Sequence, residues 1–380
     1  MPEQETSGHP SPSETVTFTE QFFSSSLYTI FREERNFLAL IGLFFFIAGV
    51  TFPHAEIAKW VGFALAGYSA IANDSIQTIG TFIASNEDKK WWVLWLFIGG
   101  IFMATVSYSW YVNDGDVTYQ RLSAKGFSEA PTSFTFLQIA APIFLLLLTR
   151  MRMPVSTTFL ILSCFSANAS AIGDVLIKSV SGYFVAFGTA IVVWIVLSKA
   201  IQKLTKGKAH SIWMVFQWIT SGALWAVWIM QDAANIAVYL PRSLSFPQFL
   251  AFSTFIFLGL GLLFYLRGDK IQRVVTEKSD VSDIRSATII DFVYAIILYY
   301  FKIQSNIPMS TTWVFIGLLA GREIAMSFTD VRGKGKPLKA SLQLIGKDVG
   351  YALVGLAVSI ALAIAINPAI KAEFLSFFFG

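Results

Sequence analysis

Long apolar runs separated by short polar stretches dominate the chain from residue 37 onward. A helix needs roughly 20 mostly apolar residues to cross a bilayer. The candidate runs lie at 37–53, 60–85, 91–111, 134–149, 154–175, 180–198, 211–240, 246–266, 287–303, 308–328 and 348–366. The pattern predicts an all-α polytopic membrane protein with about 11 membrane segments. Because 154–175 and 308–328 are the more polar runs, we expect them to be broken helices or re-entrant hairpins.

The first 36 residues form a polar N-terminal tail rich in Ser, Thr, Glu and Pro. We expect about the first 20 residues to be disordered. Apolar residues such as Phe23, Leu27 and Phe31 recur at helical spacing, so 21–36 is predicted to form an amphipathic interfacial helix. No cationic stretch precedes an apolar core in this tail, so no cleaved signal peptide is expected.

Composition supports the membrane prediction and narrows the function classes. Hydrophobic residues make up 55% of the chain and charged residues 14%, whereas a soluble domain carries about 25% charged residues. Cys164 is the only cysteine, so no internal disulfide forms and no oxidising compartment is implied. The three histidines show no metal-ligand spacing with other residues. The lipid bilayer is the expected environment, and no nucleic-acid partner is expected.

Basic residues are distributed unevenly between the two sides of the predicted bundle. If each segment makes one crossing, one side receives the basic residues of 32–35, 89–90, 150–152, 199–208 and 332–339, together with the mixed-charge loop 267–286. The other side receives only scattered ones, such as Lys59, Arg121, Lys125, Lys178 and Arg242. The positive-inside rule then places the N-terminus and the 199–209 loop in the cytoplasm. The expected location is an inner or plasma membrane.

An internal repeat relates the two halves of the chain. Pro154-Val-Ser-Thr-Thr returns 154 positions later as Pro308-Met-Ser-Thr-Thr, and Asn73-Asp-x-x-Gln returns 158 positions later as Gln231-Asp-x-x-Asn. Five predicted segments separate equivalent points, and an odd number reverses direction, so the repeat has inverted topology, as in many secondary transporters. The expected organisation is a tail at 1–36, an extra transmembrane helix at 37–59, and repeats at 60–209 and 210–380.

Asp74 and Asp232 lie deep in apolar sequence, where a carboxylate is costly unless it has partners inside the bundle. Their duplication favours a pair of acids that bind a coupling cation or carry a proton. The alternative is interhelical hydrogen bonding that serves only packing. The amides beside the two acids are Asn73, Gln77, Gln231 and Asn235.

The two Pro-x-Ser-Thr-Thr motifs offer hydroxyl groups and free backbone N–H groups at predicted helix starts. Such neutral donors can hold an anion inside a membrane without a buried Lys or Arg. The alternative is ordinary N-capping by Ser and Thr. The duplication favours anion binding, and the candidate residues are Ser156, Thr157, Thr158, Ser310, Thr311 and Thr312.

Further charged residues stand in or beside the second hydroxyl segment. Arg322 has Asn168 as its repeat partner, so its charge breaks the symmetry of the repeat. It could contact an anion, but a local ion pair with Glu323 is slightly favoured. Asp291 is interpreted as a helix-start residue.

At these motifs the chain resembles the inorganic phosphate transporter (PiT) family, which has Gly-x-Asn-Asp-x-x-Asn and Pro-x-Ser-Thr-Thr-His motifs in each half. The resemblance spans about residues 60–366 in motif order. It implies phosphate uptake coupled to sodium or protons, with Asp74 and Asp232, beside Asn73 and Gln231, as the cation-binding residues and a possible sodium site at the two acids. It assigns the anion to the six hydroxyl residues, together with Gln77 and Asn235.

The sequence also departs from the pattern of the family at several positions. Ile71 and Ile229 replace glycines, and Gln77 and Gln231 replace asparagines. Phe159 and Trp313 stand where the family has histidines.

The leading hypothesis is therefore a secondary active transporter that moves inorganic phosphate by cation symport and alternating access. The alternatives are transport of another anion such as sulfate, or a non-transporting membrane sensor or scaffold on the same fold. We expect no enzyme activity and no cofactor. Sodium or a proton is the expected coupling ion, and a homodimer is left open.

Overall fold

The computed structural model describes residues 34–124, 126–151, 153–204, 209–266, 284–329 and 337–379. The predicted interfacial helix at 21–36 lies outside these ranges, except for its last three residues. All regular secondary structure in the described residues is helical, which confirms the all-α prediction. Six described helices are long and apolar enough to cross a membrane. The total of about 11 membrane segments stays a prediction.

The helices differ widely in length. In chain order they are α2 (Arg35–Thr51), α3 (Ala55–Thr78), α4 (Gly80–Ser85), α5 (Trp91–Val112), the 3-10 helix η1 (Arg121–Ser123), α6 (Phe136–Arg150), α7 (Thr157–Leu160), the 3-10 helix η2 (Leu162–Phe165), α8 (Ala169–Leu204), α9 (Ile212–Ala237), α10 (Phe246–Tyr265), α12 (Ile284–Gln304), α13 (Thr311–Thr329), α14 (Leu338–Ile366) and α15 (Pro368–Phe379).

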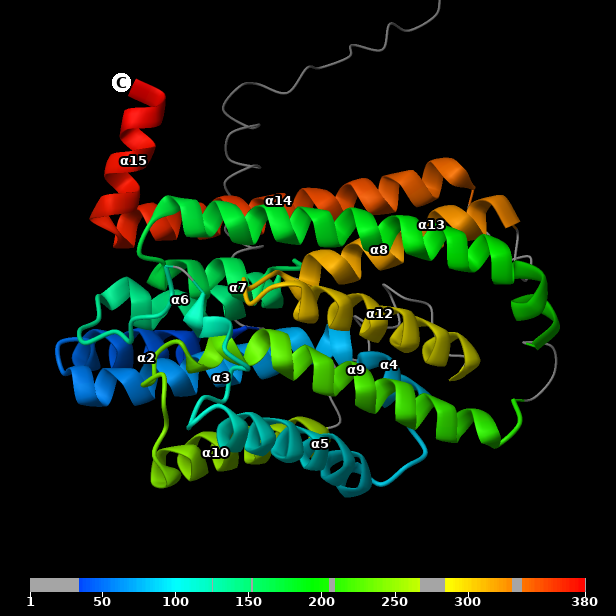
Figure 1. The fold of residues 1–380 in the computed structure, drawn as a ribbon, viewed down its shortest axis with the longest axis horizontal. Helices are drawn as coiled ribbons and strands as arrows, with labels where there is room; N and C mark the ends of the chain where they lie inside the picture. Colours follow the sequence, from blue (N-terminus) through cyan, green and yellow to red (C-terminus); the bar gives the residue numbers. More distant parts are fainter. Residues whose placement is uncertain are drawn as a thin grey trace, which may run out of the picture.

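Most helices lie roughly along the long axis of the molecule (Figure 1). Along one side α8 packs closely on α13, and α13 also contacts α14. Along the opposite side α5 packs on α10. Between these layers lie α3 with α6 and α9 with α12. The acidic motifs are on α3 and α9. The two acids therefore lie on interior helices.

Two predicted segments, 60–85 and 308–328, differ from the structure in whether the helix is interrupted. The run 60–85 is interrupted at Ile79, between α3 and α4. The hydroxyl of Thr78 bonds to the backbone oxygen of Asp74 at 2.8 Å, a side-chain bond that often bends helices. The run 154–175 is broken as expected, into α7, η2 and the start of α8, whereas 308–328 forms the unbroken helix α13.

The prediction of separate segments at 154–175 and 180–198 is wrong, because α8 runs without interruption from Ala169 to Leu204. The gap between the two predicted segments contains Lys178 and Ser179, but both side chains find partners inside the protein. The Lys178 ammonium bonds to Ser305 and Ile307, and the Ser179 hydroxyl bonds to Val175 O at 2.6 Å. A helix whose polar side chains are satisfied by neighbouring helices needs no break.

Glycines allow α8 and α13 to approach closely. A Cβ on Gly317 would lie 2.3 Å from Tyr183 O, and one on Gly321 would lie 2.2 Å from Phe187 O. No side chain fits at either separation. Small residues at such contacts let helix backbones pack tightly in membranes.

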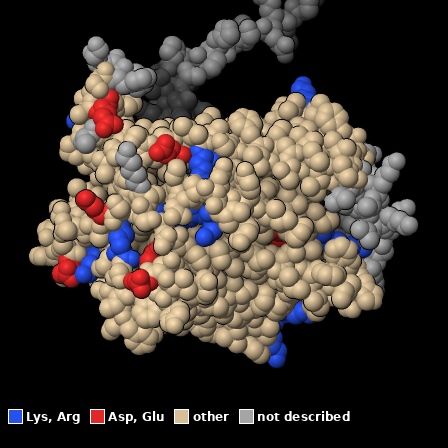
Figure 2. Space-filling model, viewed as in Figure 1, with Lys and Arg blue, Asp and Glu red and all other residues tan. Residues whose placement is uncertain are grey.

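The molecular surface matches a lipid environment. On the face in Figure 2, acidic and basic side chains gather toward the left end, further Lys and Arg lie toward the right end and the lower edge, and most of the surface between them is uncharged. Large apolar side chains point outward on several helices, including Phe46 (68% exposed), Phe184 (63%) and Val196 (70%). Exposed apolar area on this scale is expected of membrane-spanning helices, whose solvent is hydrocarbon.

Candidate functional site

The first half-site is built around Asp74 on α3. The Thr157 hydroxyl donates to both carboxylate oxygens of Asp74, at 2.9 and 2.8 Å. The Asn73 amide donates to Asp74 Oδ1 at 2.8 Å and to Val155 O at 3.0 Å. Thr149, at the end of α6, donates to Asn73 Oδ1 at 2.9 Å. The first acidic motif and the first hydroxyl motif are therefore in direct contact.

The second half-site is built around Asp232 on α9. The Asn235 amide donates to Asp232 Oδ1 at 2.6 Å, and the Thr158 hydroxyl approaches the same oxygen at 3.3 Å. Asn235 also donates to Thr158 Oγ1 at 3.1 Å. The Thr311 side chain lies beside the carboxyl group without hydrogen-bond geometry to Oδ2. Thr157 and Thr158 thus connect one hydroxyl motif to both acids, which lie close enough to repel each other.

The two hydroxyl motifs bond to each other in a reciprocal pattern. Thr158 Oγ1 donates to Met309 O at 3.1 Å, and the repeat-equivalent Thr312 Oγ1 donates to Val155 O at 3.3 Å. Residues 158 and 312, like 155 and 309, are equivalent under the sequence repeat. An exchange of identical bonds is what a pseudo-two-fold relation between the motifs requires.

The serines of the motifs serve as helix caps. Ser156 Oγ accepts from the Phe159 N–H at 3.2 Å, and Ser310 Oγ accepts from the Trp313 N–H at 3.3 Å. This is the N-capping alternative raised from the sequence. Within each motif the serine supports the helix start, while the threonines at 157, 158 and 312 bond outward to the acids or to the partner motif.

Phe159 and Trp313 meet between the two halves. Their ring centroids lie 5.8 Å apart at 67°, an edge-to-face contact. These are the positions where the family that the sequence resembles has histidines. An aromatic pair therefore takes the place of two titratable rings, and this part of the interface depends on packing.

Every predicted site residue is buried, with 6% or less of its surface exposed. Ten of them make the contacts described above; Gln77 and Gln231 are not shown in contact with either carboxylate. Gln231 instead donates to Leu298 O on α12 at 3.0 Å. A site with this burial is closed to water on both sides, so any ligand exchange requires helices to move.

Unsatisfied oxygens identify which groups could hold a cation. In the described structure four buried side-chain oxygens of the acidic motifs lack a hydrogen-bond donor: Gln77 Oε1, Gln231 Oε1, Asp232 Oδ2 and Asn235 Oδ1. A buried acceptor without a partner is costly, and oxygen atoms are the preferred ligands of hard cations. These oxygens are therefore of the ligand type that sodium prefers, and a proton on Asp232 Oδ2 would turn that acceptor into a donor.

Sequence reasoning missed one buried polar side chain of α12, Tyr294, and misinterpreted another, Asp291. Tyr294 is fully buried on α12, and its hydroxyl donates to Thr311 O at 2.9 Å. Asp291 was interpreted as a helix-start residue, but it lies well inside α12 and is 1% exposed. It accepts from Thr81 on α4 at 2.8 Å and from Ser221 on α9 at 2.5 Å.

Asp291 belongs to a second buried polar network. Ser221 accepts from Gln217, which also bonds to Ser85 and Asn86 of the α4 region. Sequence spacing could not predict this network, because Thr81 and Asp291 are 210 positions apart. An acid inside an apolar segment was the available signal.

Arg322 pairs with its neighbour, as the slightly favoured interpretation predicted. Its Nη1 lies 3.4 Å from Glu323 Oε1, with both side chains mostly buried. This ion pair lies on α13.

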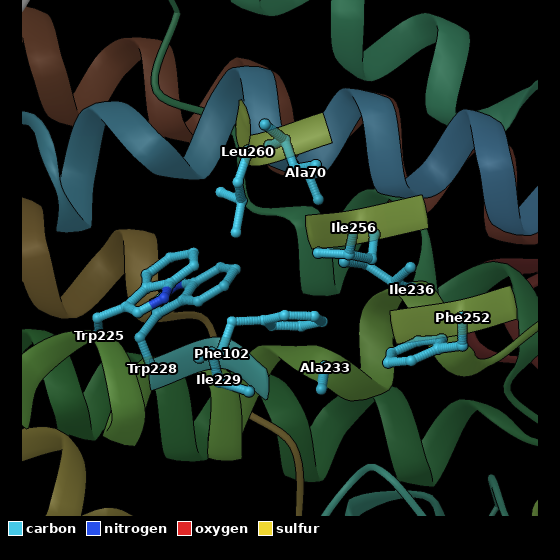
Figure 3. Close-up of a pocket in the computed structure, with 11 residues that line it drawn as sticks. Ala70, Phe102, Trp225, Trp228, Ile229, Ala233, Ile236, Phe252, Ile256 and Leu260 are labelled. Carbon is cyan, nitrogen blue, oxygen red and sulfur yellow. The ribbon is translucent and has the colours of Figure 1, made fainter. Parts of the chain in front are cut away.

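A small cavity of about 20 Å³ lies between α3, α5, α9 and α10 (Figure 3). Its walls are apolar and include Phe102, Trp225, Ile229 and Phe252. It has room for about one water molecule and supplies almost no hydrogen-bond partners. This cavity is therefore not an anion site, although it adjoins the helices that carry both acids.

The chain is similar to a known protein in its fold. No protein-family model matches the chain, and no curated protein matches it. Among solved structures, one described as "The sodium-dependent phosphate transporter" matches 86% of this chain and 99% of its own, at 17% sequence identity and a TM-score of 0.50. At this identity the likeness concerns the fold alone. The chain is a multi-pass helical membrane protein with the fold of a transporter.

Proposed function

We propose that this protein is a secondary active transporter that carries inorganic phosphate together with sodium or protons by alternating access. The observation that carries the proposal is the pair of buried carboxylates, each bonded to threonine hydroxyls of the first hydroxyl motif. The similar fold of the solved structure named "The sodium-dependent phosphate transporter" supports it. Transport, rather than catalysis, is the role that suits a closed polar site between inverted halves.

The hydrogen-bond arrangement suggests how cation and anion are coupled. A hydroxyl has a single proton to donate, and Thr157 directs its proton to Asp74, while Thr158 shares its proton between Asp232 and Met309 O. A cation or proton at the carboxylates satisfies these oxygens and releases the hydroxyls. The released hydroxyls can then donate to an oxyanion. Cation and anion binding are then mutually favourable, as linkage requires.

Charge also favours co-transport of a cation. Two buried carboxylates and an incoming anion concentrate negative charge where the dielectric constant is low. Moving an anion against a negative-inside potential costs about 2.3 kcal/mol per charge per 100 mV. Cations bound at Asp74 and Asp232 reduce both costs. The remaining candidate, another oxyanion such as sulfate, uses the same neutral hydroxyl donors and is separated by experiment.

Uptake by purified protein in proteoliposomes tests the proposal. Radiolabelled phosphate is expected to accumulate inside vesicles when a sodium gradient or a proton gradient is imposed, and each gradient is imposed alone. Unlabelled sulfate serves as the competitor that identifies the preferred anion. Absence of gradient-driven uptake of either anion would contradict the transporter assignment and favour a sensor or scaffold.

Topology is a second expected result, and we propose a cytoplasmic N-terminus in a cell membrane. Cysteines introduced singly in 112–133 and in 199–209 are expected to react with impermeant reagents from opposite sides, the first from outside. Cys164 is buried and can be replaced by Ser or Ala beforehand. Labelling of both regions from the same side would contradict the proposed topology.

A further inference from the structure

Two buried cations converge on one backbone oxygen beside the second hydroxyl motif. Arg121 of η1 is fully buried, and Lys178 of α8 is 8% exposed. Arg121 Nη1 and Lys178 Nζ both donate to Ser305 O. Since a single carbonyl oxygen carries only a partial negative charge, it does not neutralise two full positive charges.

Both side chains are tied to the second half-site. Lys178 donates to Ile307 O at 2.7 Å, and the next residue, Ser179, accepts from the Ser310 N–H at 2.8 Å. Arg121 Nε donates to Met230 O at 3.3 Å, two residues before Asp232 on α9. The two cations therefore hold the segment that leads into the second hydroxyl motif, and Arg121 also contacts the helix of the second acid.

The surroundings of the pair add positive charge. Lys302 lies near Arg121, with its ammonium 5.4 Å from the centroid of the Tyr119 ring. Asp174, one turn before Lys178, is exposed and forms no ion pair with it in the described structure. Asp232 is the acid whose field reaches Arg121. Within the described residues the cluster has more positive than negative charge.

A helix cap alone does not account for this arrangement. Arg121 Nη2 donates to Lys302 O at 3.2 Å, so the pair does satisfy carbonyls at the C-terminal end of α12. A cation at a helix C-terminus is favourable, but neutral amides could also donate to these carbonyls. A second buried cation adds repulsion, and the single negative charge of Asp232 does not balance both cations.

Among the residues that the structure describes, the first half-site has no comparable pair of buried cations. Arg150, at the corresponding tip of α6, forms a bidentate pair with Glu34, at 2.5 Å for Nη2 to Oε1 and 3.0 Å for Nε to Oε2. Its charge is therefore neutralised locally. Asp74 receives hydrogen bonds from Thr157 and Asn73 and forms no ion pair with a described Lys or Arg.

We propose that Arg121 and Lys178 are positioning residues that make the second half-site the anion-preferring half of the transporter. The inference rests on the proposed function and adds a division of labour to it. The fixed positive charge draws an inorganic oxyanion such as phosphate toward Ser310 and Thr311. Around Asp74, in the first half-site, the described residues place no comparable pair of buried cations.

The test measures phosphate and sodium binding separately in purified protein at constant ionic strength. Lys178→Gln and Arg121→Gln keep amide donors for the carbonyls but remove the charge. Each is expected to weaken phosphate affinity about tenfold, with sodium affinity in the absence of phosphate unchanged or higher. Lys178→Arg, which keeps the positive charge, is expected to keep the phosphate affinity of the wild type. Lys339→Gln, which removes an exposed charge at the start of α14, serves as the matched control.

The possible results separate the inference from its alternatives. Wild-type phosphate affinity in both Gln variants overturns the inference and leaves the proposed function standing. A loss of thermal stability with unchanged phosphate affinity identifies the cations as helix caps and also overturns it. A wild-type protein that binds no oxyanion overturns the proposed function and this inference together.

Discussion

Asp232→Asn is expected to lower the initial rate of cation-driven phosphate uptake by at least about 100-fold, and Asp74→Asn by a similar factor. Each carboxylate is the acid of its duplicated motif and is almost completely buried, at 2% and 1% exposure. Asparagine has nearly the same size, so packing is preserved while the negative charge is removed. Without that charge the coupling cation loses its main electrostatic attraction.

The two variants are also expected to lose the dependence of phosphate affinity on sodium or pH. In Asp74→Asn and Asp232→Asn the neutral side chain no longer attracts the cation that would release the threonine hydroxyls from their hydrogen bonds. The linkage between the two ligands therefore disappears. The measurements are uptake in proteoliposomes and phosphate binding across a sodium series and a pH series. Asp88→Asn, at a side chain that is 73% exposed, is the control and is expected to behave as the wild type.

The coupling role of these acids is wrong if either variant transports normally with wild-type cation dependence. A second result is equally informative. If wild-type phosphate affinity ignores both sodium and pH, the cation is not linked to the anion at this site. Retained folding must be shown by size-exclusion elution and thermal unfolding, since both acids bond to neighbouring helices.

Gly321→Ala is expected to destabilise the protein by about 3 kcal/mol and to lower its thermal unfolding midpoint by about 5 °C. The added Cβ would lie 2.2 Å from Phe187 O and 2.9 Å from the Ala190 Cβ. A backbone carbonyl in the middle of α8 cannot turn away as a flexible side chain can. The two helices must therefore separate, which also shifts the second hydroxyl motif at the start of α13.

Gly188→Ala is the matched control for this prediction. Gly188 lies on α8 of the same helix pair, and a Cβ there meets nothing within 4 Å. Alanine is favoured over glycine in a helix interior by about 1 kcal/mol, so this variant is expected to be as stable as the wild type or slightly more stable. Equal unfolding midpoints for Gly321→Ala and the wild type would show that α8 and α13 do not pack as closely as the structure indicates.

The sequence by itself determined the class of the protein and its main chemical groups. The apolar runs predicted an all-α membrane protein because hydrophobicity and helix length are local properties of the chain. The duplicated motifs drew attention to Asp74 and Asp232, and to the threonines that the structure places beside them, since an ionisable residue in an apolar segment stands out without any structure. The boundaries assigned to the repeats and the roles assigned to these residues stay predictions.

Local pattern was misleading where polar residues find their partners at a distance. The predicted segments left Lys178 and Ser179 in a gap, yet both residues lie inside the continuous helix α8, where Ser305, Ile307 and Ser310 accept or donate their hydrogen bonds. Asp291 was read as a helix start because Thr81 and Ser221 are remote in sequence. In each case the deciding partner lies more than 60 positions away.

Only the tertiary structure decided how the duplicated motifs divide their roles. From the sequence, Ser156 and Thr157 were equivalent hydroxyl donors; in the fold, Ser156 caps a helix and Thr157 binds Asp74. The positive charge of Arg121 and Lys178 beside one half-site was likewise invisible, because a loop and two helices from different parts of the chain bring it there. Hydrophobic pattern specifies which segments enter the membrane, whereas packing between remote segments specifies which polar atoms meet.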